Sequence, residues 1–78
     1  MNLSRHAKNN MRLYKISEED IMITIERPDS KTIEGNRSTV FKQFSKKFSG
    51  YDLKVVYERI GGSVTVITAY PLKKKHWR

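Results

Sequence analysis

Three side chains of this sequence have the chemistry to transfer protons or bind a phosphate without a metal. His6 can act as acid or base near neutral pH, Arg12 can hold a phosphate through two hydrogen bonds, and Tyr70 offers a hydroxyl group and a ring. RNA that is cleaved through attack by its own 2′-hydroxyl group brings its own nucleophile, so a base, an acid and positive charge at the phosphate suffice. These residues fit that reaction, with Lys54 as a further phosphate ligand.

Each of these residues also has an ordinary structural interpretation. A lone histidine on a helix is more often a surface or packing residue, and an arginine on a basic helix face can serve solubility alone. Tyr70 ends a strand on the face that we expect to be buried, where a role in the core is favoured. A non-catalytic nucleic-acid-binding module is therefore the alternative to an enzyme.

Metal and cofactor chemistry has no support in the residue pattern. The chain has no cysteine and two histidines, which is too few for a zinc site without carboxylate ligands. It lacks a glycine-rich phosphate loop, a nucleophile elbow and a carboxylate pair at catalytic spacing. We expect neither a metal nor a cofactor.

The formal charge of +8 is large for 78 residues and is unevenly distributed. Residues 18–29 hold five acids and one arginine, which gives −4 and leaves +12 for the rest of the chain. Lysine and arginine residues that neutralise phosphates release counterions, so a polyanion is the favoured partner. We expect RNA, free or on the ribosome, while an acidic protein partner and a solubilising surface are the alternatives.

The last residues are strongly basic and include an aromatic ring. Trp77 offers a stacking surface, and the expected RNA-binding residues are Lys73, Lys74, Lys75, His76 and Arg78. A frayed tail that only keeps the protein soluble is the competing interpretation of residues 71–78.

The length allows one domain with one small core. No apolar run approaches the roughly 20 residues that a membrane span needs, and residues 1–15 are too polar for a signal peptide. We expect a cytoplasmic protein without a membrane partner.

Two amphipathic segments open the chain. Leu3, Ala7, Met11 and Tyr14 repeat at helical spacing, which predicts a helix over about residues 3–15 with Ser4 or Asn2 as its cap. Ser17 and Asp20 have capping-box spacing, which predicts a second helix over about residues 18–27 that must end before Pro28. The acids of its first turn have a structural explanation in the helix dipole.

Alternating and β-branched residues then predict four strands, at about residues 31–34, 38–45, 52–60 and 63–70. The last two form the strongest hairpin, with Gly61 and Gly62 as a two-residue loop. Uniform pairing around this loop places Tyr57 opposite Val66, Val55 opposite Thr68 and Leu53 opposite Tyr70. The buried face then comprises Leu53, Val55, Tyr57, Val64, Val66 and Tyr70, while Lys54, Val56, Glu58, Thr65, Ile67 and Ala69 face the other way. The predicted fold is α+β, with two N-terminal helices on a twisted antiparallel sheet of three to four strands.

Short motifs occur along nearly the whole chain: Arg5-His6-Ala7, Met11, Ile16-Ser17, Asp20-Ile21, Pro28-Asp29, Leu53-Lys54-Val55-Val56 and Val66-Ile67-Thr68-Ala69-Tyr70. This pattern resembles a family of small uncharacterised prokaryotic domains allied to the RelE and ParE toxins. The resemblance implies a RelE-like fold, a metal-independent ribonuclease site on or beside the sheet, and an acidic antitoxin as partner.

The resemblance matches His6 to the family's histidine and Tyr70 to the aromatic residue that closes its last strand. The chain departs from the pattern at Tyr14 and Lys15, where relatives commonly have an arginine and a glycine. Arg12 stands about 200° around a helix from position 14, so it does not replace that guanidinium in place. An inactive relative that only binds is therefore an alternative to a toxin-like ribonuclease.

Overall fold

The structure is a computed structural model that describes residues 1–72 of the 78-residue chain. Its helices and strands follow one another as β1 (Asn2–Leu3), α1 (Arg5–Tyr14), α2 (Glu18–Glu26), β2 (Ser30–Glu34), β3 (Arg37–Gln43), β4 (Asp52–Ile60) and β5 (Ser63–Leu72). One 3₁₀ turn, η1 (Phe48–Gly50), precedes β4. The predicted α+β class is confirmed, and neither α1 nor α2 is long and apolar enough to cross a membrane.

The sheet has five strands in the order β1-β5-β4-β3-β2, which is more than the three to four that we predicted. Four strands are antiparallel neighbours, whereas β1 pairs with β5 in parallel, so the sheet is mixed. The missed strand comprises Asn2 and Leu3 alone. Two residues are too few to show an alternating pattern, and we had assigned Leu3 to the following helix.

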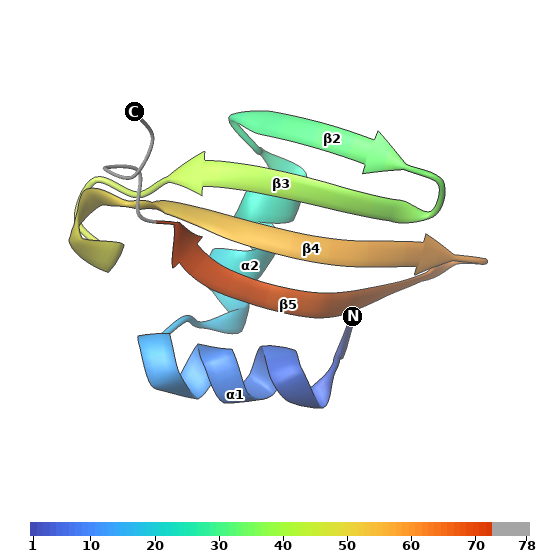
Figure 1. Cartoon of the computed structure of the whole chain (residues 1–78), viewed down its shortest axis with the longest axis horizontal. Helices are drawn as coiled ribbons and strands as arrows, with labels where there is room; N and C mark the ends of the chain where they lie inside the picture. The colour runs from blue at the N-terminus through green and yellow to red at the C-terminus, as the bar shows by residue number, and fades with distance from the viewer. Residues whose placement is uncertain (73–78) are drawn as a thin grey trace.

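The two helices occupy different positions around this sheet (Figure 1). α2 crosses behind it and contacts β3 and β4, while α1 runs alongside β5 at the edge that β1 only partly covers. No helix of the described residues crosses the front of the sheet in this view. The sheet therefore has a helix side and an uncovered face.

Ser4 connects α1 to the sheet. As the N-cap of α1 it accepts a hydrogen bond from the backbone of Ala7 at 3.0 Å, as its residue type and position predicted. Its hydroxyl group also donates to the carbonyl of Ile67 at 2.7 Å, and its backbone N–H donates to the carbonyl of Val66 at 3.0 Å. One residue thus caps the helix and satisfies two carbonyl groups of β5.

The end of α1 has an unusual backbone conformation. Lys15, the C-cap of α1, has a φ of 58° and a left-handed backbone conformation. Glycine adopts this conformation without a steric penalty, and other residues adopt it at a cost. Lys15 therefore ends the helix at the expense of some strain.

The predicted capping box of α2 is present. Ser17 accepts a hydrogen bond from the backbone N–H of Asp20 at 3.0 Å, and the Asp20 carboxylate accepts one from the backbone N–H of Ser17 at 3.1 Å. The same buried carboxylate forms an ion pair with Lys47 at 2.8 Å. Asp20 therefore connects the start of α2 to the segment that precedes η1.

Both tight hairpin loops begin with a glycine at positive φ. Gly35, between β2 and β3, has a φ of 62°, and Gly61, between β4 and β5, has the same value. Positive φ at the first loop residue is the geometry of the type II′ turn, which matches the twist of the flanking strands. These glycines set the strand register next to each loop.

The predicted register of the β4–β5 hairpin is right near the loop and wrong beyond it. Tyr57 pairs with Val66 as expected, but Val56 pairs with Thr68, so Ile67 is an extra residue in β5. Such a β-bulge shifts the following pairs by one position and reverses the faces of their side chains. Leu53 consequently pairs with Pro71, and Lys54 pairs with Tyr70.

The bulge corrects the predicted burial of β5. Tyr70, which we placed on the buried face, is only half-buried, whereas Ala69, which we placed on the other face, is fully buried. The rest of the predicted face fits, because Leu53, Val55, Tyr57 and Val66 are buried and Val64 packs against them. The core is completed by Ala7 of α1, Ile16, Ile21 of α2 and Val40 of β3.

Replacing Ser4→Ala should destabilise the protein by about 1–2 kcal/mol, because the helix loses its cap and the carbonyl of Ile67 loses its partner. Urea denaturation followed by circular dichroism measures this loss. Ser45→Ala, in an exposed loop, is the control and should change stability by less than about 0.5 kcal/mol. Equal stability of the two variants would contradict the role of Ser4.

Burial raises the pKa of Asp20, but hydrogen bonds from Lys47 and Ser17 outweigh it, so this pKa lies below its ordinary value of 3.8. The unfolded chain binds the proton more tightly than the folded one, so ionised Asp20 stabilises the fold above about pH 4 and loses this effect as pH falls further. Asp20→Asn should therefore be less stable than the wild type at neutral pH. The difference in free energy of unfolding between the two proteins should become smaller below about pH 4.

Unfolding midpoints in urea at about pH 7 and about pH 3 test this expectation. Glu19→Gln, an exposed acid in the same helical turn, is the matched control. A gap between wild type and Asp20→Asn that stays constant with pH would show that the carboxylate charge is not what stabilises this site.

Candidate nucleic-acid interface

The uncovered face carries a lysine between two aromatic rings. The register places Phe41 of β3, Lys54 of β4 and Tyr70 of β5 side by side across three strands. The Lys54 Nζ atom lies 6.0 Å from the centre of the Phe41 ring and 5.4 Å from that of Tyr70. We call these three residues the aromatic–lysine row. Cations at this distance are attracted to the ring faces, which holds Lys54 in place.

Lys54 is available for an external anion. It takes part in neither of the two ion pairs found within residues 1–72. On the same face, Arg37 and Glu58 neutralise each other through a salt bridge of 2.9 Å. Among the residues that the structure describes on this face, Lys54 is therefore a cation outside any ion pair, between two flat apolar surfaces.

The next row across the same face reaches α1. Val56 pairs with Thr39 on one side and with Thr68 on the other, and the Asn10 amide donates to the Thr68 hydroxyl at 3.3 Å. Asn10 thus marks the flank of α1 that turns toward the uncovered face. His6 lies one helical turn before Asn10 on this flank and is exposed.

The predicted catalytic residues are not all brought together. Arg12 is exposed and stands about 200° around the helix from Asn10, so it projects away from the flank that carries His6. The fold joins Tyr70 to Lys54, places His6 on the neighbouring helix flank, and separates Arg12 from the row. Lys54 is therefore the phosphate ligand that the geometry favours.

The remaining predicted RNA-binding residues are Lys73, Lys74, Lys75, His76 and Arg78, and they lie outside the described residues. Within residues 1–72, no three histidine, aspartate or glutamate side chains are grouped closely enough to hold a metal ion. Among the described residues, the uncovered face thus combines the aromatic–lysine row with hydroxyl groups and the Arg37–Glu58 pair, and the flank of α1 beside it adds an amide and an imidazole.

Sequence reasoning missed Phe41. Phe41 lies in a strand with an alternating pattern, but the sequence does not show which residue of β4 stands beside it. In the structure Phe41 pairs with Lys54. The missing signal is thus a register between two strands separated by the loop of residues 44–51, which has no fixed turn pattern.

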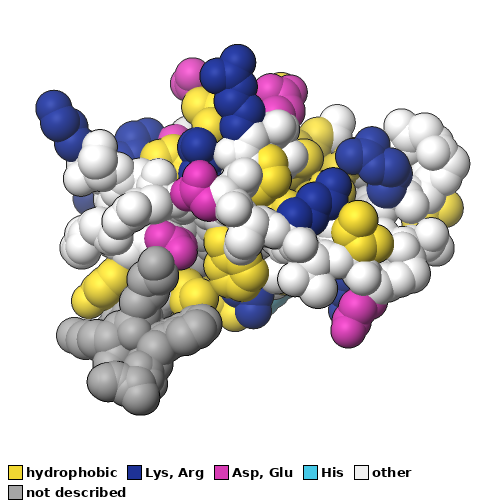
Figure 2. All heavy atoms as spheres, turned by 90° about the horizontal axis from the view of Figure 1, so that it is seen from above, with side chains coloured by type: hydrophobic (Ala, Val, Ile, Leu, Met, Phe, Trp, Pro, Cys, Tyr) yellow, Lys and Arg dark blue, Asp and Glu magenta, His cyan; other side chains and the backbone are white. Residues whose placement is uncertain are grey.

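On the side of the molecule that Figure 2 shows, the lysine and arginine side chains of the described residues do not gather in a single block. Viewed from above Figure 1, they are dispersed among acidic and hydrophobic side chains (Figure 2). Net charge alone therefore does not locate an interface on this side of the molecule, whereas the aromatic–lysine row is defined by contacts.

Comparison with known proteins identifies the family of this chain. No curated protein and no solved structure matches the chain. One family model matches residues 3–71, from the end of β1 to near the end of β5. The chain therefore belongs to the family described as Domain of unknown function (DUF4258), which spans both helices, the aromatic–lysine row and His6.

Proposed function

We propose that this protein is a toxin-like, metal-independent endoribonuclease of RelE-like type that binds single-stranded RNA on its uncovered face. The observation that carries the proposal is the position of Lys54 between the rings of Phe41 and Tyr70. Aromatic side chains stack with bases of any sequence, and a lysine beside them neutralises the backbone phosphate. Stacking on a protein ring requires an unpaired base, which favours single strands over duplexes.

The cleavage reaction uses the neighbouring groups as follows. His6 accepts the proton of the 2′-hydroxyl group, whose oxygen attacks the adjacent phosphorus atom. Lys54 stabilises the negative charge that builds up on the phosphoryl oxygens. The bond to the 5′-oxygen breaks, and this oxygen takes a proton from the Tyr70 hydroxyl group. The products are a 2′,3′-cyclic phosphate and a 5′-hydroxyl end.

A non-catalytic RNA-binding module is the second candidate, and a specific feature favours it. Arg12 projects away from the row, and Glu58, one of the carboxylates that the register places on this face, is held by Arg37. The uncovered face therefore offers fewer proton-transfer groups than phosphate-binding and stacking groups. Binding requires only the row, whereas cleavage also requires His6 to reach the same phosphate.

We also propose an acidic, antitoxin-like protein as partner. The charge of +12 outside residues 18–29 would attract such a chain as it attracts RNA. An adjacent short gene with an acidic, helix-rich product, and growth arrest when this protein is expressed without it, would support the pair. Growth unaffected by expression of this protein alone would argue against a toxin.

Replacing Lys54→Gln should weaken binding of a labelled oligouridine by about tenfold at about 0.1 M salt, because one charged phosphate contact is lost. The slope of log affinity against log salt should become shallower by about one unit. Phe41→Leu and Tyr70→Leu should each weaken binding as well, through loss of stacking. Fluorescence anisotropy at several salt concentrations measures all three effects.

Lys42→Gln is the matched control for this test. Lys42 lies one strand away on the helix side of the sheet, where its ammonium group donates to the carbonyl of Arg27 at 3.1 Å. It carries the same charge, so a purely non-specific effect would weaken binding equally in both variants. If Lys54→Gln and Lys42→Gln lower the RNA affinity equally, the aromatic–lysine row is not the binding site.

Cleavage is tested separately, with RNA and purified protein in excess chelator. The enzyme should release fragments that end in cyclic phosphate, and His6→Ala should lower the rate by about 10²–10⁴-fold while leaving binding intact. Tyr70→Phe, which keeps the ring and removes the hydroxyl group, should slow cleavage more than it weakens binding. Wild-type protein that binds RNA but yields no such fragments would establish the binding module instead.

A further inference from the structure

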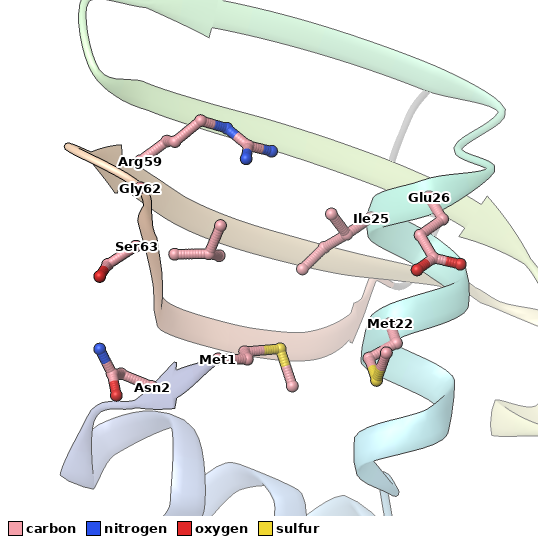
Figure 3. A pocket seen from close by; sticks show the side chains of 9 residues that line it. Met1, Asn2, Met22, Ile25, Glu26, Arg59, Gly62 and Ser63 are labelled. Atoms are coloured by element: carbon pink, nitrogen blue, oxygen red, sulfur yellow. The ribbon is translucent and has the colours of Figure 1, made fainter.

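A second site lies on the helix side of the sheet, away from the aromatic–lysine row. An open pocket of about 420 Å³ is bounded by α2, by β1 and by the loop between β4 and β5 (Figure 3). Its volume falls in the range of small-molecule sites, about 300–1,000 Å³. The residues that matter for its chemistry are Met1, Met22, Ile25, Val64, Glu26 and Arg59.

The pocket follows from a mismatch in length between elements. α2 has 9 residues and so extends about 14 Å, whereas β4, with 9 residues, extends about 30 Å. Pro28 prevents the helix from continuing. The loop end of the β4–β5 hairpin therefore projects beyond the helix layer, and its helix side is left uncovered at Arg59 and Val64, which pair across the two strands.

The walls of the pocket are apolar. Met22 and Ile25 line it from α2, Val64 lines it from β5, and Met1 lines it at the start of the chain. Met22 is 46% exposed and Met1 is 50% exposed, so both side chains are accessible to a ligand. Methionine adapts its shape to different apolar surfaces, which suits contact with a ligand.

Two opposite charges stand on different walls of the pocket. Arg59 extends from β4 and Glu26 from α2, and no ion pair within residues 1–72 joins them. The Arg59 guanidinium lies 5.9 Å from the centre of the Tyr57 ring, which restricts its position. Arg59 therefore offers a positioned cation beside apolar walls.

The hydroxyl group of Tyr57 lies in locally basic surroundings. Burial raises the pKa of Tyr57, but hydrogen bonds with Ser38, Lys31 and Arg59 outweigh it, so the pKa lies below its ordinary value of 10.0. The two basic groups stabilise negative charge at the Tyr57 hydroxyl. The same local field favours an external anion at Arg59.

We propose that this pocket binds a small amphipathic carboxylate, with its apolar body against Met22, Ile25 and Val64 and its carboxylate on Arg59. Arginine matches a planar carboxylate through two parallel hydrogen bonds. A singly charged carboxylate fits better than a doubly charged phosphate, because Glu26 repels negative charge from the opposite wall. This site is independent of the proposed RNA-binding face.

Octanoate is a suitable probe, with octanol and octylamine as neutral and cationic ligands of the same chain length. The chain has three methionines, of which Met1 and Met22 line the pocket and Met11 does not. In protein with ¹³C-labelled methionine methyl groups, octanoate should shift the signals of Met1 and Met22, leave that of Met11 in place, and saturate with a dissociation constant below about 1 mM. Octanol and octylamine should bind at least about fivefold more weakly.

Removing the charge of Arg59 or of Glu26 should change the affinity for octanoate in opposite directions. Arg59→Gln should weaken octanoate binding at least about fivefold, and Glu26→Gln should strengthen it by about twofold. Arg37→Gln, an arginine on the uncovered face that pairs with Glu58, is the matched control and should leave it unchanged. Equal affinity for octanoate and octanol, stronger binding of octylamine, or no effect of Arg59→Gln would overturn the proposal, whatever the outcome of the RNA experiments.

Discussion

The extra residue in β5 determines which side chains stand on each face of the sheet. Between the loop and the bulge at Ile67, β4 and β5 pair as the loop predicts. Beyond the bulge, every side chain of β5 lies on the face opposite to the one that uniform pairing would give it. Ala69 thereby enters the core and Tyr70 leaves it. The exchange suits both residues, because a small side chain allows α1 to pack along β5, while a buried tyrosine would need a partner for its hydroxyl group. Without the bulge, Tyr70 would be buried opposite Leu53, and the aromatic–lysine row would not exist.

The bulge in turn depends on the start of α1. A bulge disrupts the regular hydrogen bonds of a strand, so nearby carbonyl groups need other donors. Ser4 provides two of them, through its backbone N–H to Val66 and its hydroxyl group to Ile67. Because Ser4 also caps α1, the helix that carries His6 and Asn10 is fixed to the irregular part of β5. The contacts of Ser4 therefore fix the position of α1 relative to the register of β5. His6 is placed beside the uncovered face as a result.

Local signals in the sequence predicted the elements better than their long-range pairing. Ser4, Ser17 and Asp20 cap their helices as expected, and Gly61 sets the pairing of Tyr57 with Val66, because these effects act within a few residues. The bulge and the two-residue β1 have no such signal, since they depend on contacts between residues more than 60 positions apart. The arrangement of the candidate site residues has no local signal for the same reason. Lys54 and Tyr70 were recognised as candidates, but their proximity depends on the shifted register, and Phe41 depends on a third strand.

β4 separates the two proposed sites although it contributes to both. Its side chains alternate, so Lys54 stands on the uncovered face with Phe41 and Tyr70, and Arg59 stands on the helix side beside Tyr57. β4 thus gives each face one cation that is held by aromatic contact, Lys54 by two rings and Arg59 by one. The two faces differ in shape around these cations. On the uncovered face the rings leave a flat surface, which suits bases and a phosphate backbone. On the helix side the short α2 leaves a pocket with apolar walls, which suits a compact ligand. In the two proposals the basic residues accordingly have two local uses, and strand alternation rather than net charge decides where each one lies.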